Sequence, residues 1–232
     1  MLRKLLLAVA LVTVSFTPHV ATVLAAPHQA CCGAITPEGY RLIDLIDSMN
    51  VEKLWLAHQH VNWETGESDR PADYNGPGNH THCSAFAAAL GERLNIYLLR
   101  PPDHSEILLA SAQAEWFHSS DGFKKGWTAI EGPQRAEQAQ ALANRGFLVT
   151  IVYESPDPHK PGHIVIVRPS EKSAGDLAIE GPQIAQAGTL NHSNSIAAKS
   201  FTAHPGAWPD NVRYYSHPVD WTSIPSKPKA GN

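Results

Sequence analysis

Two residues of this sequence combine a reactive side chain with a position that favours chemistry, Cys83 and His163. Cys83 precedes an alanine-rich stretch in which Phe86 and Leu90 have helical spacing, so it is expected at a helix N-terminus. Exposed backbone N–H groups and the helix dipole favour a thiolate there, and the N–H of Cys83 could donate to an oxyanion. His163 follows Gly162 at the opening of an apolar strand, from which its ring could project toward a packed helix. The pair predicts a site for nucleophilic catalysis.

A third polar group is expected on the next extended stretch of the chain. Gln183 and Gln186 lie there three residues apart, so only one of them can face the imidazole. We favour Gln186, whose amide could orient the ring and fix its tautomer through a neutral hydrogen bond. Both glutamines have the alternative of being ordinary surface or strand-end amides.

The cysteine count offers a competing interpretation of Cys83. The chain has three cysteines, and an odd number in an exported protein indicates a free thiol or an intermolecular bridge. Cys31 and Cys32 are adjacent and could bridge to each other only through a strained ring, so we expect them on a mobile leader, reduced or variably oxidised. Cys83 could instead pair with one of them, or simply be buried as a small apolar residue.

Metal binding is the competing hypothesis from another functional class. The chain has 13 histidines, and His58 with His60, and His80 with His82, have spacings that put two rings on one side of a strand. No cysteine or carboxylate spacing completes a standard ligand set, so we assign no metal ligand and expect no cofactor. A histidine-rich metal-binding periplasmic module without catalysis is the alternative that metal analysis would detect.

The elements that must position these residues indicate an α+β fold, with helices first and an antiparallel meander after them. Helical spacing and capping signals predict helices over 37–49 and 83–94, a helix that follows a capping box at Asp103 and Glu106, and a helix over 133–145. Apolar runs predict strands over 147–153 and 163–167, a weaker one over 176–187, and an edge strand over 212–216. The Gly-, Pro- and Asn-rich stretch 62–82 predicts an irregular loop.

The ends of the chain are expected to lie outside this domain. Arg3 and Lys4, the apolar run 5–14 and the small residues 21–26 form the three regions of a secretory signal peptide over 1–26. We expect a flexible leader over 27–36, the folded domain over 37–217 and a flexible tail over 218–232. No later segment reaches the roughly 20 apolar residues of a membrane span, so we expect a periplasmic or extracellular protein.

Composition narrows the functional classes further. Hydrophobic residues make up 43% of the 232 and charged residues 17%, a balance that suits one domain with a buried core. The formal net charge is −4, and loss of Arg3 and Lys4 with the signal peptide leaves about −6. General binding to nucleic acid or to anionic membranes is therefore not expected, because it needs a basic face.

Two glycosylation acceptor patterns bear on the source of the chain. They begin at Asn79 and Asn191. A glycan on Asn79 would crowd Cys83, so a catalytic Cys83 favours a bacterial envelope protein made without glycosylation.

From about residue 70 to 190 the sequence resembles the papain-like cell-wall hydrolases, the NlpC-like peptidases and CHAP amidases. The matching segments are Cys83-Ser84 at a helix start, 162–167 (GHIVIV) on a strand and 184–188 (IAQAG) on the following strand, in that order. The resemblance implies a nucleophile helix packed on an antiparallel sheet and hydrolysis of amide bonds in peptidoglycan. It implies that Cys83 is the nucleophile, that His163 is the general base and then acid, and that Gln186 orients the ring.

Upstream of the cysteine the sequence departs from the NlpC-like pattern. His82 stands where an aspartate is common, and Tyr74 is followed by Asn75-Gly76 in place of Trp-Gly-Gly. The candidates for a second oxyanion donor or a substrate contact are Tyr74, Asn79, His82 and Gln183. The loop 62–82 and the segment 154–161 would flank the cleft, and the tryptophans that could line it are Trp55, Trp63 and Trp116.

The substrate and the partners follow from the same resemblance. We expect peptidoglycan or another peptide as substrate, and transfer of acyl groups or cleavage of proteins on the same fold are alternatives. An inhibitor or immunity partner is compatible with the sequence, which carries no specific sign of one.

Overall fold

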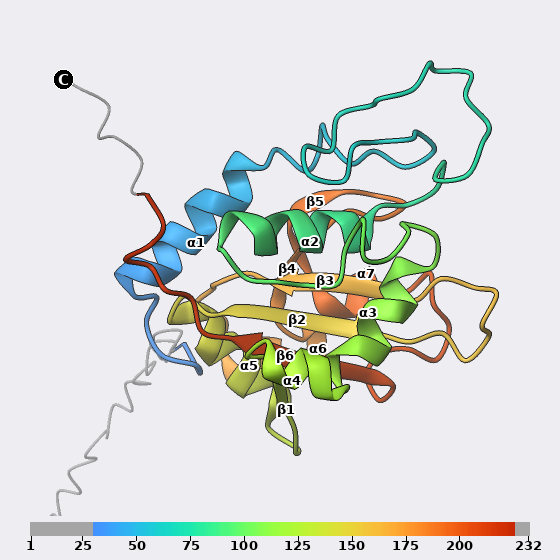
Figure 1. Ribbon diagram of the computed structural model, residues 1–232. Helices are drawn as coiled ribbons and strands as arrows, with labels where there is room; N and C mark the ends of the chain where they lie inside the picture. The colour runs from blue at the N-terminus through green and yellow to red at the C-terminus, as the bar shows by residue number, and fades with distance from the viewer. Residues whose placement is uncertain (1–29, 226–232) are drawn as a thin grey trace, which may run out of the picture.

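A computed structural model describes residues 30–225, so the expected signal peptide and the last residues of the tail lie outside the described part. Within this part the chain forms a six-stranded antiparallel sheet with helices on it (Figure 1), which confirms the α+β class. The strand order is β1-β6-β2-β3-β4-β5. The strands are β1 Thr128–Ile130, β2 Leu148–Tyr153, β3 His163–Val167, β4 Gln183–Gln186, β5 His192–Ile196 and β6 Val212–His217. The helices are α1 Pro37–Ser48, α2 Cys83–Arg93, α3 Leu109–Phe117, α4 Ser120–Lys124, α5 Arg135–Asn144, α6 Ala174–Glu180 and α7 Ala197–Ser200.

Helices cover both faces of this sheet and divide the core into two clusters. One face packs on α1, α2 and α3, and its strand residues include Leu148 and Ile164. The other face packs on α5 and α7, and its strand residues include Ile151 and Val165. Burial on both faces explains why β2 and β3 are continuous apolar runs rather than alternating ones.

Helix α2 runs alongside β3 on one face of the sheet (Figure 1), and the sulfur of its first residue, Cys83, meets the backbone N–H of Ile164 near the start of that strand. Its alanines, Ala85, Ala87, Ala88 and Ala89, are all buried. Small side chains let a helix backbone approach a sheet closely, and alanine is also the best helix former. The larger Phe86 packs edge-on against Trp55, with 5.5 Å between the ring centroids. This packing holds Cys83 at a fixed place against the sheet.

Two sequence predictions about helices and strands were wrong in detail. The helix expected after Asp103 and Glu106 begins only at Leu109, because Leu108 has a left-handed backbone (φ 55°) and Asp103 accepts a hydrogen bond from Tyr97 instead. The first half of the strand expected over 176–187 is helix α6, whose N-terminus is capped by the Ser173 hydroxyl. Only its second half forms a strand, β4.

The strand expected at the sheet edge also takes another place. β6 lies between β1 and β2 and pairs with both of them. β1 is only three residues long and β5 has the polar sequence HSNSI, so neither carries the apolar pattern by which strands are recognised. The edges of the sheet are therefore formed by the two strands that the sequence pattern did not predict.

The described parts of the expected leader and tail contact the folded domain. Ala30 forms an isolated bridge with Ser173, and the Asn144 amide donates to the carbonyl of Gly33. At the other end Trp221 donates its indole N–H to Gly146, and Arg41 donates to the carbonyls of Trp221 and Ile224. Residues 30–36 and 219–224 thus belong to the packed structure.

The cysteine pairing differs from the expectation. Cys31 and Cys32 form a disulfide with each other, in place of the reduced or variably oxidised state expected for them. Their segment is held against the domain by a backbone hydrogen bond from Cys31 to Lys172, rather than lying on a mobile leader. Cys83 is a free, buried thiol, which removes the alternative that it pairs with Cys31 or Cys32.

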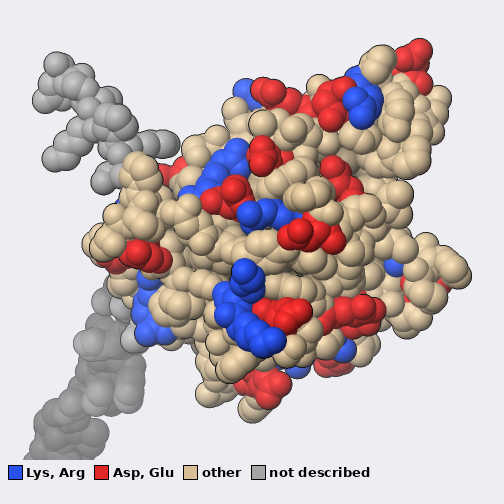
Figure 2. All heavy atoms as spheres, in the orientation of Figure 1, with Lys and Arg blue, Asp and Glu red and all other residues tan. Residues whose placement is uncertain are grey.

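The surface carries mixed charge. On the face shown in Figure 2, basic and acidic side chains are interspersed. Several are ion-paired, including Lys124 with Asp121 at 3.3 Å and Lys172 with Glu180 at 2.7 Å. In residues 30–225 no helix has the length and apolar character that a bilayer crossing needs.

Candidate active site

Cys83 is the first residue of α2 and is almost fully buried, with 4% of its surface exposed. Its sulfur lies beside the backbone N–H groups of Cys83, Ser84 and Ile164, which favour the thiolate. Burial outweighs them and raises the pKa of the thiol above its ordinary value of 9.0. The thiol is therefore protonated at neutral pH in the free protein.

The imidazole of His163 forms a hydrogen bond with the side chain of Gln186. His163 Nε2 lies 3.0 Å from Gln186 Oε1, and both side chains are buried. Gln186 Nε2 donates to the carbonyl of Leu190 at 3.0 Å, which fixes the orientation of the amide. Because an amide oxygen only accepts, Nε2 of His163 carries the hydrogen and Nδ1 is left as the basic nitrogen.

Gln186 is thus the glutamine that faces the histidine, as the sequence pattern favoured. Gln183 points elsewhere, because its side chain donates to Asn194 and its backbone N–H donates to the Gln140 side chain. It lines neither cavity that adjoins Cys83 or His163. Gln183 is therefore no candidate for a substrate contact at this place.

Two aromatic rings cover the histidine. Phe201 lies edge-on to His163 at 5.3 Å between centroids, and His204 stacks on it at 5.2 Å with an angle of 19° between the planes. Burial lowers the pKa of His163 to about 4, although the bond to Gln186 acts in the opposite direction. His163 is therefore a neutral base at pH 7. No motif marks His204, so sequence reasoning missed it.

Cys83 and His163 approach the start of β3 from different sides. Side chains alternate along a strand, so His163 shares a face with Val165, which packs on the α5 and α7 side. Cys83 lies on the α2 side with Ile164, whose backbone N–H meets the sulfur. Within residues 30–225 the thiol and the imidazole have no hydrogen bond to each other. The ring was expected to project toward α2. That expectation was wrong, because alternation along β3 places the His163 side chain on the face of the sheet opposite to Ile164 and α2.

Two cavities adjoin these side chains and meet at a common rim. The cavity at Cys83 has a volume of about 170 Å³, and the cavity at His163 and Gln186 has a volume of about 610 Å³. Thr81 and Pro161 line both of them. The expected flanking segments, 62–82 and 154–161, thus each contribute a residue to this rim. The larger cavity is of the size that holds small ligands in proteins.

The tryptophans expected in the cleft lie elsewhere. Trp55 is fully buried in the core, and neither Trp63 nor Trp116 lines the cavities at Cys83 and His163. Both pack against the cluster on the α2 face. Their role in the described structure is packing.

The three upstream oxyanion candidates have other hydrogen-bond partners. The Tyr74 hydroxyl donates to Pro77, the Asn79 amide donates to Tyr74, and His82 Nε2 lies 2.8 Å from the carbonyl of Gln59. None of them lines the Cys83 cavity. The groups beside the sulfur that could donate to an oxyanion are therefore the backbone N–H groups of Cys83, Ser84 and Ile164.

A buried polar cluster stands next to the thiol. His80 Nε2, His82 Nδ1 and Glu106 Oε2 are buried and have no hydrogen-bond partner, and His82 Nδ1 lies 4.0 Å from Glu106 Oε2. Burial lowers the pKa of His82 to about 4 and raises that of Glu106. Across residues 30–225, no three His, Cys, Asp or Glu side chains are arranged so that they could hold a metal ion. His58 and His60, the other expected pair, are likewise not part of such a group.

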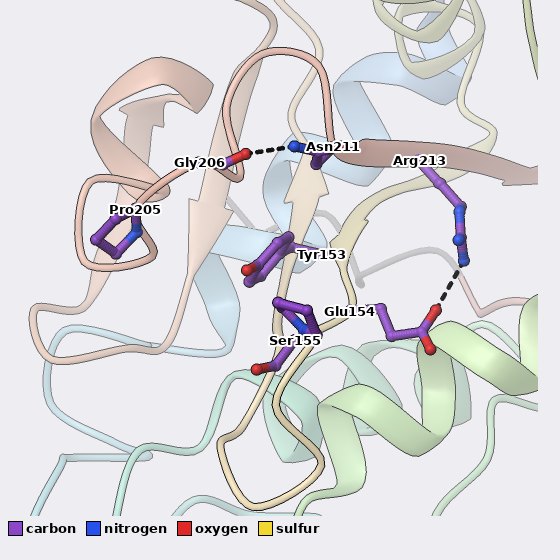
Figure 3. Close-up of a pocket in the computed structure, with 8 residues that line it drawn as sticks. Tyr153, Glu154, Ser155, Pro205, Gly206, Asn211 and Arg213 are labelled. Atoms are coloured by element: carbon purple, nitrogen blue, oxygen red, sulfur yellow. Dashed lines mark hydrogen bonds and ion pairs between the residues drawn. The ribbon is translucent and has the colours of Figure 1, made fainter.

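A separate cavity of about 420 Å³ lies where β2 ends and β6 begins (Figure 3). Tyr153, Glu154 and Arg213 line it, and the Arg213 guanidinium is paired with the Glu154 carboxylate at 2.9 Å. Neither Cys83 nor His163 reaches it. The candidate active site is therefore placed at the two cavities near the start of β3, which Cys83 and His163 line.

Comparison with known proteins assigns no family to the chain, so its function is argued from the site. No protein-family model matches the chain, and no curated protein matches it. A free thiol at a helix start, a neutral imidazole held by an amide and a cavity beside each are the features on which the function is proposed.

Proposed function

We propose that the protein is a papain-like cysteine hydrolase that cleaves amide bonds in peptidoglycan stem peptides. The observation that carries the proposal is the hydrogen bond between His163 and Gln186. His163 is the first residue of β3, and the backbone N–H of the next residue, Ile164, meets the Cys83 thiol. The bond leaves Nδ1 of a neutral imidazole free to accept a proton. The choice of peptidoglycan rests on the sequence resemblance.

The reaction would proceed by acyl transfer through Cys83. The sulfur attacks the amide carbon while its proton passes to Nδ1 of His163. This attack converts the amide carbonyl into a tetrahedral oxyanion. The backbone N–H groups of Cys83 and Ser84 stabilise this oxyanion. The C–N bond then breaks, and His163 gives the proton to the leaving amine. Water, activated by the same imidazole, attacks the thioester, and the proton returns to the thiol.

The proposal requires contact between the sulfur and Nδ1 in the substrate complex. In the free protein the two groups are neutral and lie on different sides of the start of β3, so no preformed thiolate–imidazolium pair exists. Catalytic hydrogen bonds are often long in free enzymes and shorten when substrate binds. Thr81 and Pro161 line both cavities, so a substrate that displaces this rim would join them, and the proposal further requires that the start of β3 shifts until Nδ1 reaches the sulfur.

The proposed function also implies where the protein acts and that it needs no cofactor. An exported protein with a signal peptide over 1–26 would reach peptidoglycan in the periplasm or outside the cell. The chemistry above uses only side chains and backbone groups of the chain, and it needs no cofactor. Chelators should therefore leave turnover unchanged. A stoichiometric metal that a chelator removes together with all activity would favour the metal-binding alternative.

Digestion of defined peptidoglycan fragments tests the function. The wild-type protein should convert a muropeptide into two products whose summed mass exceeds the mass of the substrate by one water, and tandem mass spectrometry identifies the bond. Adding a free amine and a denatured protein in parallel separates the alternatives: an amine adduct indicates an acyltransferase, and cleaved protein indicates a protease. No turnover of any of these substrates would overturn the proposal.

A further inference from the structure

The described residues that line the cavity at His163 and Gln186 include a lysine but no acidic residue. Its volume is about 610 Å³, and the residues that line it include Thr189, Ser195 and Thr202. Among the described residues that line it, Lys199 is the one side chain with a formal charge at pH 7, apart from titratable histidines. No aspartate or glutamate lines it, although the chain as a whole has 22 acidic and 18 basic residues.

Lys199 is held at this wall by the packing of α7. Ala197 and Phe201 on either side of it are buried, and Phe201 contacts the ring of His163. The carbonyl of Lys199 accepts the hydroxyl of Thr202 at 2.8 Å, which fixes the backbone at the end of the helix. The backbone that carries Lys199 is therefore linked to the candidate base through Phe201, while Lys199 itself is exposed.

The Lys199 ammonium has no carboxylate partner within residues 30–225. Lys124, Lys160 and Lys172 each pair with a carboxylate within 4.0 Å, whereas no such pair involves Lys199. Glu52 lies at the start of β5, whereas α7 follows its end, and the Glu52 carboxylate accepts hydrogen bonds from the backbone N–H and the hydroxyl of Ser193. An ammonium beside a cavity without acidic groups attracts an anion.

We propose that Lys199 is a specificity-determining residue that binds a free carboxylate of the substrate in the cavity beside His163. The inference rests on the proposed function and adds the substrate class: acidic peptides, with the carboxylate on the His163 side of the scissile bond. The hydroxyl groups of Thr189 and Ser195 supply further donors to the same carboxylate. Amidation of that carboxylate removes the charge and leaves the shape almost unchanged.

Binding to a catalytically blocked protein tests this inference separately from turnover. The background is the Cys83→Ser variant, and the probes are a synthetic stem tetrapeptide with free carboxylates and the same peptide fully amidated. Calorimetry should give a Kd for the free acid about tenfold lower than for the amide, which corresponds to one charge-assisted contact. The ratio should fall as salt is added, because the contact is screened.

The Lys199→Met substitution in the same background should bring the ratio of the two Kd values to about one. Lys124→Met, an exposed lysine on α4 outside the cavity, is the matched control and should preserve the tenfold ratio. Equal ratios in Lys199→Met and in its parent, or no binding of the acidic peptide, would overturn the inference. If the acid binds through Lys199 but the wild-type protein cleaves no amide bond, the proposed function fails while the anion site stands.

Discussion

His163 and Gln186 are joined by a hydrogen bond of 3.0 Å from Nε2 of the imidazole to Oε1 of the amide. Gln186 in turn donates to the carbonyl of Leu190, so the amide cannot turn without loss of a buried bond. The tautomer of His163 is thereby set, with Nδ1 as the acceptor. This arrangement is the feature of the structure that most specifically suits a general base.

Two substitutions of Gln186 should distinguish its effect on the orientation of the His163 ring from the effect of a charge beside that ring. Gln186→Ala leaves the ring unheld, and we expect kcat/KM to fall about 10²-fold, the usual cost of a misplaced catalytic group. Gln186→Glu places a carboxylate beside the ring, which should raise the pKa of His163 from about 4 and move the acid limb of the pH–rate profile upward by about 1–3 units. Gln183→Ala is the matched control and should leave the profile unchanged. An unshifted acid limb in Gln186→Glu would contradict the assigned role.

The buried thiol should react slowly with alkylating agents. Burial raises the pKa of Cys83 above 9.0, so the thiolate fraction at pH 7.5 is smaller than in the unfolded chain. We expect iodoacetamide to modify Cys83 at least about tenfold more slowly in the native protein than in urea, with a rate that rises steadily above pH 9. Mass spectrometry of the Cys83 peptide measures both rates. A fast, pH-independent reaction between pH 5 and 7 would instead indicate a preformed ion pair.

The stability of the fold should depend on pH in a defined direction. His82, His163 and His204 have pKa values of about 4 in the folded protein because of burial, against an ordinary 6.5. The unfolded state therefore binds more protons between pH 6.5 and 4, and the free energy of unfolding should fall as the pH is lowered through this range. The raised pKa of Cys83 has the opposite effect, so stability should also fall above about pH 9.

Urea denaturation at a series of pH values measures both limbs. His204→Phe should reduce the slope of the acid limb, since one titrating group is removed, and Cys83→Ala should flatten the alkaline limb. A denaturation midpoint that stays constant from pH 7 to pH 4.5 would contradict the burial of the three histidines as neutral groups.

Asn191 should contribute more to stability than an ordinary polar residue. Its amide lies 2.8–3.1 Å from the carbonyls of Val51, Leu54 and Trp55, and its oxygen accepts the backbone N–H of Gly188. Asn191→Ala leaves these groups without partners, and we expect a loss of about 2 kcal/mol in the free energy of unfolding. Asn211→Ala, which removes one exposed bond to Gly206, is the control and should cost about 0.5 kcal/mol. Similar losses in the two variants would show that the Asn191 network is not cooperative.

The same contacts bear on glycosylation. The nitrogen of Asn191 that a glycan would occupy is the donor of these three bonds, and the corresponding nitrogen of Asn79 donates to Tyr74. Both acceptor patterns are therefore used by the fold itself.

The sequence predicted the elements whose periodicity is strong. α1, α2 and β3 begin within a residue of their expected positions, because capping, alanine content and continuous apolar runs are local signals. The start of α3 depends instead on the left-handed Leu108, which no local pattern indicates. The polar β5 is a strand only because β4 lies beside it, so its formation is a tertiary effect.

The candidate site was predictable in part for similar reasons. That only one of Gln183 and Gln186 could face the ring followed from alternation along one strand, which the sequence displays directly, whereas alternation alone did not say which of the two it is. The side of the sheet on which His163 lies depends on how α2 and α7 divide the two faces, and this is set by packing between distant segments. His204 and Lys199 reach the site through the connection after β5, which has no recognisable motif.

The most direct test of the central claim is the acylation of Cys83 during turnover. A muropeptide is mixed with the protein, the reaction is quenched in acid within milliseconds to seconds, and the intact mass is measured. We expect a thioester adduct on the Cys83 peptide of the wild-type protein, and neither adduct nor product from Cys83→Ala, whose melting temperature should stay close to that of the wild type. Hydrolysis by Cys83→Ala at the wild-type rate would show that the thiol is not the nucleophile.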